Sequence, residues 1–452
     1  MEKKKGSLRS TIAVSLTNYL DAGAIVAGAS GLTLWQNYLG LSEGNLGWLN
    51  AISANCLGAA IGAIIGGFLA DRYGRKFIYS YNMLLYMAGV ALIMCSVNFV
   101  MLLLGFLVTG ISVGVGVPAS WTYISENSET GNRGRNICIS QMAWGIGPFI
   151  ILILGMLLAP PTANGAGGPL FGLVSSVVGS LSGGTVTGAA LGVWASRIVF
   201  GSLFIVALIA WLLQRRLNES KEWEDARAAE KKDAGTFSSF GKLFTNKLNV
   251  RTMLFLAGMY LSWNLVASVM GFFQPHIYET AGGLSNAGAN LLTACQWIVI
   301  IGTTFVLSLV VDKMNQRWLF FTGVCFAVLA WVMVIWVGVN SLTGLIIFTL
   351  LWAIQGGISV QTFYALWASE LFPAKYRAAA QGIMFFVVRG LSAVWGLGFV
   401  YIYGPNGEGF KTAAYVMMGL LLISLIIGTV FAPDTRGKTL DQITKERYGE
   451  DA

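Results

Sequence analysis

The sequence predicts an all-α membrane protein of twelve transmembrane helices in two pseudo-symmetric six-helix halves. Of its 452 residues, 55% are hydrophobic and 11% are charged, and the mean hydropathy is +0.67. Soluble domains carry about 25% charged residues, so this composition excludes a water-soluble globular fold. Apolar runs of about 20 residues recur along the chain, each long enough to cross a hydrocarbon core about 30 Å thick. The runs are continuous rather than alternating, which favours helices over a β-barrel.

Each apolar run predicts one helical span. The expected spans are 10–38, 45–70, 77–97, 99–124, 134–158, 191–213, 252–278, 286–311, 317–338, 341–369, 378–403 and 410–431. The expected units are an N-terminal half at 1–213, a polar linker at 214–250, a C-terminal half at 251–431 and a tail at 432–452. The outer loop at 159–192 is long and rich in Gly and Ser. Its segment Leu170–Leu181 is expected as an interfacial turn, a lid or a mobile spacer without chemistry.

The placement of basic residues predicts the orientation. Of the 29 Lys and Arg residues, all but Arg197, Arg389 and Lys411 fall in alternate connections and in the two termini. By the positive-inside rule these segments are cytoplasmic, so we expect a multi-pass plasma-membrane protein with both termini in the cytoplasm. No single basic face exists outside these connections, which disfavours a nucleic-acid partner.

Cysteine and histidine usage predicts no disulfide framework, no metal and no cofactor. The five cysteines all lie in predicted spans, and His276 is the single histidine. The sequence also lacks a nucleophile–base constellation, so an enzyme is not expected.

Charged residues recur at matching positions of the two halves. Glu126 and Arg133 stand seven residues apart at the inner end of the fourth span, as do Glu370 and Arg377 at the tenth. Asp312 of the second half corresponds to Asp71 of the first, although fewer of the surrounding motif residues recur. Such parallel repeats predict two halves that enclose a midplane substrate site and alternate by rocking.

Several spaced motifs resemble those of known transporters. Gly66–Phe77, reading GGFLADRYGRKF, resembles the signature between the second and third helices of the major facilitator superfamily. Longer motifs resemble the sugar porter family: Tyr123–Glu126 with Arg133 and Gln141, Ser369–Pro373 with Arg377, Glu219 with Trp223, and Pro433–Lys438. The resemblance covers nearly the whole chain and implies the major facilitator fold and sugar transport.

Charges at the inner face predict a cytoplasmic gate of ion pairs across the two halves. The expected gate residues are Asp71, Arg75, Glu126, Arg133, Glu219, Glu370 and Arg377. Each exposed pair contributes only about 0–1 kcal/mol, but a network can bias a two-state equilibrium. The alternative is that these residues anchor helix ends at the lipid headgroups.

Substrate-binding candidates follow from depth and from the resemblance. Gln141 lies eight residues beyond Arg133, about 12 Å into the membrane, where the resemblance implies a sugar-binding glutamine. An amide suits hydroxyl groups because it both donates and accepts hydrogen bonds. The further candidates are Asn264, Gln361, Tyr364, Trp263 and Trp395, and packing is the alternative role for the tryptophans.

Two ionisable residues lie deep in the predicted membrane. Asp21 is about 16 Å inside the first span, and Arg389 is about 18 Å beyond Arg377; intramembrane charges are functional hypotheses by default. Asp21 resembles the first-helix aspartate of proton-coupled sugar porters, although the arginine that usually accompanies it falls at Phe106. Arg389 resembles an arginine of the organic anion transporters and can hold a carboxylate or sulfonate. The alternative is that Arg389 neutralises Asp21.

The sequence therefore predicts a monomeric secondary active transporter that imports a sugar, polyol or anionic sugar derivative with a proton. A facilitative uniporter of a neutral sugar or polyol, an organic anion carrier and a sensor that keeps the transporter fold are the alternatives. The sequence leaves the substrate and its charge open.

Overall fold

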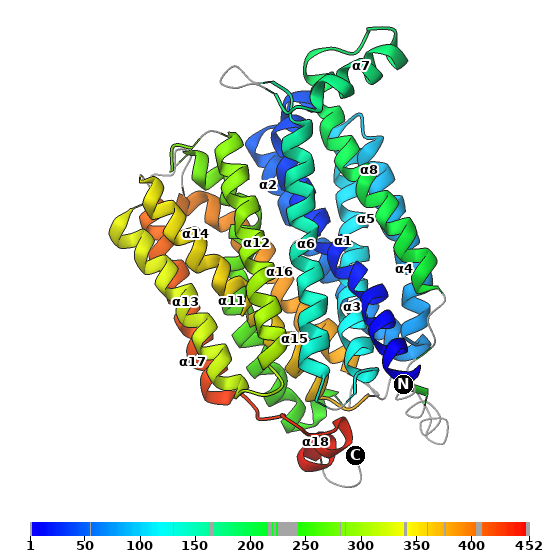
Figure 1. Cartoon of the computed structure of the whole chain (residues 1–452), viewed down its shortest axis with the longest axis vertical. Coiled ribbons are helices and arrows are strands. Elements are labelled where there is room, and N and C mark those ends of the chain that lie inside the picture. The colour runs from blue at the N-terminus through cyan, green and yellow to red at the C-terminus, as the bar shows by residue number, and fades with distance from the viewer. Residues whose placement is uncertain are drawn as a thin grey trace.

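The computed structural model describes residues 2–54, 56–129, 131–161, 167–215, 219, 223–224, 243–280, 282–284, 286–338, 341–358, 360–374, 377–403 and 409–448. Over these ranges the regular structure is helical throughout (Figure 1). The predicted linker at 214–250 falls largely outside them.

In the described part of the N-terminal half, seven helices belong to the bundle and one lies outside it. The bundle helices are α1 (Glu2–Leu39), α2 (Glu43–Ile52), α3 (Leu57–Tyr73), α4 (Arg75–Met94), α5 (Phe99–Glu126), α6 (Arg133–Leu158) and α8 (Gly188–Gln214). The outer-loop segment forms a helix, α7 (Phe171–Ser182), which projects from the end of the bundle opposite the termini (Figure 1).

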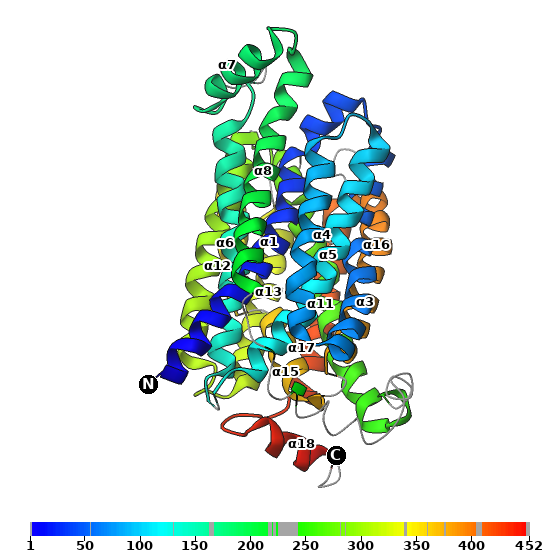
Figure 2. The same ribbon diagram turned by 90° about the vertical axis from the view of Figure 1, so that its right-hand side faces the viewer.

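The C-terminal half contains a second set of seven bundle helices, followed by a tail helix. They are α11 (Lys247–Thr280), α12 (Asn286–Val310), α13 (Gln316–Val337), α14 (Leu342–Gly357), α15 (Val360–Glu370), α16 (Arg377–Tyr403), α17 (Phe410–Phe431) and the tail helix α18 (Leu440–Tyr448). The two halves stand side by side, and both termini lie at one end (Figures 1 and 2). We call that end, where α1 starts and α17 stops, the linker end.

The predicted spans match these helices. Among the described residues, 11 stretches are long and apolar enough to cross a membrane, and they coincide with eleven of the expected spans. The remaining span, 10–38, is α1, a 38-residue helix that runs the height of the bundle (Figure 1).

Two spans expected as single helices are each divided. The span at 45–70 is split into α2 and α3, and the span at 341–369 into α14 and α15. At the first break, both the N–H and the hydroxyl of Ser53 donate to the Asn50 carbonyl, at 3.2 and 2.8 Å. A serine that bonds the preceding turn competes with the regular helical pattern, which accounts for the end of α2 at this position.

Small residues bring the two halves into close contact near the linker end. Helix α3 of the first half packs along α16 of the second. A Cβ atom at Gly67 would lie 2.5 Å from the Ala378 carbonyl oxygen, and one at Gly382 would lie 2.4 Å from that of Ala63. The glycines therefore permit a backbone approach that no larger residue allows, as is common between membrane helices.

Candidate functional site

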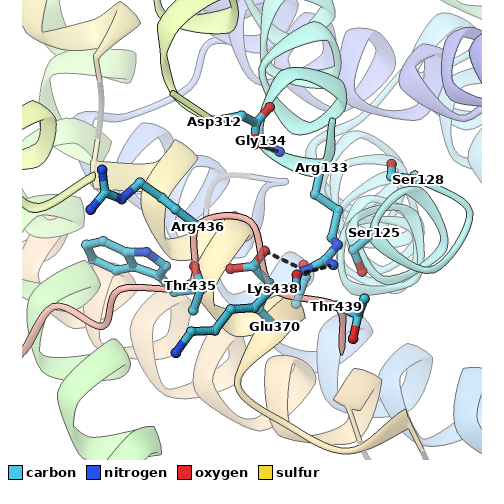
Figure 3. Close-up of polar contacts among 12 residues, drawn as sticks. Ser125, Ser128, Arg133, Gly134, Asp312, Glu370, Thr435, Arg436, Lys438 and Thr439 are labelled. Carbon is cyan, nitrogen blue, oxygen red and sulfur yellow. Dashed lines mark hydrogen bonds and ion pairs between the residues drawn. The ribbon is translucent and has the colours of Figure 1, made fainter. Parts of the chain in front are cut away.

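A buried ion pair joins the two halves at the linker end. Arg133 is the first residue of α6 and Glu370 is the last residue of α15, and Arg133 Nη1 lies 2.8 Å from Glu370 Oε1 (Figure 3). Their side chains are only 5% and 4% exposed. Arg133 Nη2 also donates to the carbonyl oxygen of Lys438 in the tail, at 2.9 Å. One guanidinium of the first half therefore binds both the tenth span and the tail of the second.

A second ion pair repeats this arrangement with the roles of the halves exchanged. Arg377 begins α16 and Glu126 ends α5, and Arg377 Nη1 lies 2.9 Å from Glu126 Oε1. The exposures are 2% and 0%. Each half thus contributes one arginine at a helix start and one glutamate at a helix end, as the sequence repeat predicts. We call these two pairs the cross-half latch.

Asp312 supplies a third contact between the halves. Its Oδ1 accepts from the Gly134 N–H at 2.9 Å (Figure 3). Its Oδ2 accepts from the Arg135 N–H at 2.8 Å. A carboxylate at a helix start satisfies unpaired N–H groups and favours the positive end of the helix dipole. Burial raises the pKa of Asp312, and the two backbone hydrogen bonds oppose that rise. The sequence indicated Asp312 as a repeat of Asp71 but did not indicate this capping contact.

Of the other predicted gate residues, the structure describes the side chain of one. Glu219, in the linker, accepts a hydrogen bond from the Lys76 N–H of the first half at 3.0 Å. The side chains of Asp71 and Arg75 lie outside the described residues. Their predicted gating roles stay predictions.

Deeper in the bundle, two glutamines meet across the halves. Gln361 Nε2 of α15 donates to Gln141 Oε1 of α6 at 3.2 Å. The two residues are 6% and 7% exposed, and the Nε2 atom of Gln141 has no hydrogen-bond partner. An unpaired buried amide is costly unless a ligand or water satisfies it, so Gln141 offers a donor to a polar ligand.

The predicted residues of α11 make bonds inside the second half. Asn264 Nδ2 donates to Ser392 Oγ of α16 at 2.8 Å, and Trp263 Nε1 donates to Gln355 Oε1 of α14 at 3.0 Å. Trp395 Nε1 is a buried donor without a partner. Substrate contact by these three residues stays a prediction.

An aromatic cluster lies across the halves. Tyr364 stacks on Tyr260 with ring centroids 4.3 Å apart and meets Trp121 of α5 edge-on at 5.9 Å. The Tyr364 hydroxyl and the Trp121 Nε1 are buried without hydrogen-bond partners. The sequence analysis missed Trp121 and Tyr260. Helical spacing could have indicated Tyr260, which lies one turn before Trp263 and Asn264.

Asp21 lies near the level of Gln141. Asn18, one turn earlier on α1, donates to Ser140 Oγ of α6 at 2.6 Å, and Ser140 adjoins Gln141. Asp21 is 1% exposed, and neither of its carboxylate oxygens has a hydrogen-bond partner. Phe106 occupies the position where the resemblance places an arginine beside the aspartate. It packs edge-on against Phe200, with ring centroids 6.0 Å apart.

Arg389 is the deep cation of the second half. It is 3% exposed on α16, and its Cζ lies 4.8 Å from the ring centroid of Phe385. Its charge acts on Asp21 of the first half and on Tyr260 and Tyr364 of the aromatic cluster.

Comparison with known proteins decides the family. Residues 22–446 match the family described as "Sugar (and other) transporter". The chain is 40% identical over 444 residues to the minor myo-inositol transporter IolF of Bacillus subtilis (strain 168), covering 97% of this chain and 94% of that protein. This chain belongs to the sugar transporter family.

Solved structures of low sequence identity share the fold. The proton:xylose symporter XylE of E. coli, solved with 6-bromo-6-deoxy-D-glucose, superposes with a TM-score of 0.73 at 17% identity, covering 98% of this chain and 99% of that one. The E. coli transporter FucP gives 0.71 at 14% identity, covering 94% and 99%. The predicted major facilitator fold, the multi-pass membrane location and the transporter rather than enzyme class are confirmed.

Proposed function

We propose that this sugar transporter imports a neutral cyclic polyol of the inositol type together with a proton, as a monomer in the plasma membrane. The observation that carries the proposal is the Gln141–Gln361 pair, which joins the halves at depth and leaves the Gln141 amide nitrogen unpaired. An amide that can donate and accept suits a ring of hydroxyl groups. The relative IolF, named as a myo-inositol transporter, supports the same substrate class.

An ionised Asp21 favours a neutral substrate over an anionic one. The positive charge of Arg389 acts on Asp21, which is buried and lacks hydrogen bonds. A substrate carboxylate at Arg389 would place a second negative charge beside Asp21, and like charges at a buried site repel strongly. While Asp21 is ionised, the site therefore disfavours a sugar acid or a sulfonated sugar.

Alternating access assigns a role to each end of the bundle. In the structure the cross-half latch is closed, so a substrate would reach Gln141 from the end opposite the linker end. Positive residues concentrate at the linker end, which we assign to the cytoplasm. Asp21, the buried acid of the first half, is the proposed proton carrier.

A binding panel tests this proposal. Calorimetry on the purified full chain compares myo-inositol, xylose, glucose and glucuronate for the parent and for Gln141→Asn. The proposal expects myo-inositol to bind, glucuronate not to bind, and the shorter amide to weaken the polyol. Tight binding of glucuronate in preference to myo-inositol would replace the polyol with an anionic sugar.

A further inference from the structure

An exposed apolar row runs along the helix that stands outside the bundle. Val174 and Val178 of α7 are buried in the hydrophobic core, and the helix packs against α6 and α8. On the adjoining side, Leu173, Val177 and Leu181 are 64%, 58% and 83% exposed. Residues four positions apart lie on one side of a helix, so these three side chains form one row, which we call the α7 row.

The other side of α7 is polar. Ser175 and Ser176 both donate from their hydroxyls to the Gly172 carbonyl, at 3.2 and 2.9 Å, and Gly172 and Ser176 are exposed. The apolar side of the helix is therefore covered in part by the bundle and left open in the α7 row, while the polar side points away from the bundle. This division is typical of a helix that lies in the plane of a membrane interface.

The position of α7 along the bundle matches the level of the lipid headgroups. Helix α6 contains 26 residues from Arg133 at the linker end to Leu158, which gives about 39 Å at 1.5 Å per residue. A bilayer with its headgroups is about 40–45 Å thick. The N–H of Leu170 donates to the Leu157 carbonyl at 2.9 Å, and α7 lies at the ends of α6 and α8 opposite the linker end (Figure 2). Helix α7 therefore starts at the headgroup level of a membrane that α6 crosses.

The composition around α7 favours lipid over a protein as the neighbour of the α7 row. No Asp, Glu, Lys, Arg or His residue occurs between Arg135 and Arg197. Protein-binding surfaces are rich in Tyr, Trp and Arg and have a polar rim, and Leu and Val are under-represented among the residues that dominate their binding energy. An uncharged row of Leu and Val fits acyl chains better than it fits such a partner.

The lipid-facing surface of the bundle reaches the helices on either side of α7. Helices α6 and α8 are both long and apolar enough to cross a membrane. Ile146 and Ile150 of α6 are exposed, as are Ile198 and Ile205 of α8. Exposed apolar surface of this kind marks contact with a membrane or a partner, and on a spanning helix it faces lipid. The α7 row, on the segment that joins α6 to α8, continues this surface.

We propose that α7 docks on the bilayer leaflet at the end opposite the linker end, with the α7 row against the acyl chains and Ser176 toward water. Because the helix carries no charge, the contact uses apolar burial and does not select anionic headgroups. The corresponding connection of the second half, residues 404–409, is shorter than the 12 residues of α7, so the contact belongs to the first half alone. It depends neither on the substrate nor on proton coupling.

Electron resonance of nitroxide labels on the full chain in lipid nanodiscs tests this contact. The labelled variants of the α7 row are Leu173→Cys, Val177→Cys and Leu181→Cys, and the controls are Gly172→Cys and Ser176→Cys, each in a background without the five native cysteines. A Cβ at Gly172 meets no atom within 4 Å, so a label fits there. Collisions of each label with oxygen, which partitions into lipid, are compared with its collisions with a water-soluble nickel chelate.

We expect the labels of the α7 row to collide more often with oxygen than with the nickel chelate, and the labels at Gly172 and Ser176 to show the reverse order. The result should be the same in nanodiscs of phosphatidylcholine alone and of phosphatidylcholine with phosphatidylglycerol. A row that collides mainly with the nickel chelate stands in water, which would overturn the inference and leave a lid or a protein-docking face. A row shielded from both reagents is covered by protein, and a row that enters lipid only beside phosphatidylglycerol depends on headgroup charge; either result would also overturn it.

Discussion

Neutralising Glu370 should open the linker end. The ion pair it forms with Arg133 is 2.8 Å long and nearly fully buried. At an effective dielectric constant of about 20, the Coulomb attraction at this distance is about 6 kcal/mol, and desolvation of both groups offsets much of it. In Glu370→Gln the amide oxygen can still accept from Arg133, and Arg133 keeps its bond to the Lys438 carbonyl.

The net loss is therefore at most that of one hydrogen bond between charged groups, about 1.5–3 kcal/mol. Since each 1.4 kcal/mol is a factor of ten, the ratio of closed to open linker end should fall about 10–100-fold. The pair is made only while the linker end is closed, so its loss acts on that state alone.

Pulsed electron resonance between spin labels measures this ratio. Cysteines at Glu129 of the first half and Lys313 of the second, both exposed, carry the labels in a background without the five native cysteines. The parent should give mainly the short distance, and Glu370→Gln should add a population at longer distance.

Two controls sharpen the measurement. Asp434→Asn removes an ion pair of 2.7 Å at the same end, but that pair is exposed and lies within the tail, so no change is expected. The exchange of Arg133→Glu with Glu370→Arg should restore part of the short-distance population. A Glu370→Gln distance distribution identical to that of the parent would show that the cross-half latch does not stabilise the closed linker end.

Three other outcomes are expected. Gln141→Ala should weaken polyol binding by about 1–3 kcal/mol in calorimetry without unfolding the protein, and an unchanged affinity would remove Gln141 from the site. Asp21→Asn should lose accumulation driven by a pH gradient but keep substrate exchange across proteoliposomes, because rocking needs no net proton movement; persistent accumulation would end its role as carrier. Gly67→Val should shift the label distance to long values, since a Cβ there would lie 2.5 Å from the Ala378 oxygen, whereas Gly302→Val, with nothing within 4 Å, should not. Equal distances in both glycine variants would show that α3 and α16 do not limit closure.

The fold could be read from the sequence because continuous apolar runs leave the backbone little choice except helices in lipid. The pairing of Arg133 with Glu370 was also within reach, since charges at matching positions of a parallel repeat meet at the same end of the bundle. The helix break at Ser53 could not be predicted from the sequence. It depends on one side chain that bonds the Asn50 carbonyl in a run that is otherwise helical.

Partners of deep polar residues were harder to predict. Asn264 bonds Ser392, and Trp263 bonds Gln355, which lie about a hundred residues away on other helices. Depth along one helix locates such a residue but does not say which neighbour faces it. For the same reason, Trp121 was missed although it packs against the predicted Tyr364.

Accumulation of tritiated myo-inositol by proteoliposomes under an imposed pH gradient is the most direct test of proton-coupled polyol import. We expect uptake to exceed equilibrium when the side of entry is acidic, and a protonophore or Asp21→Asn to return it to equilibrium. Uptake that only equilibrates, whatever the gradient, would contradict proton coupling and leave a facilitative carrier.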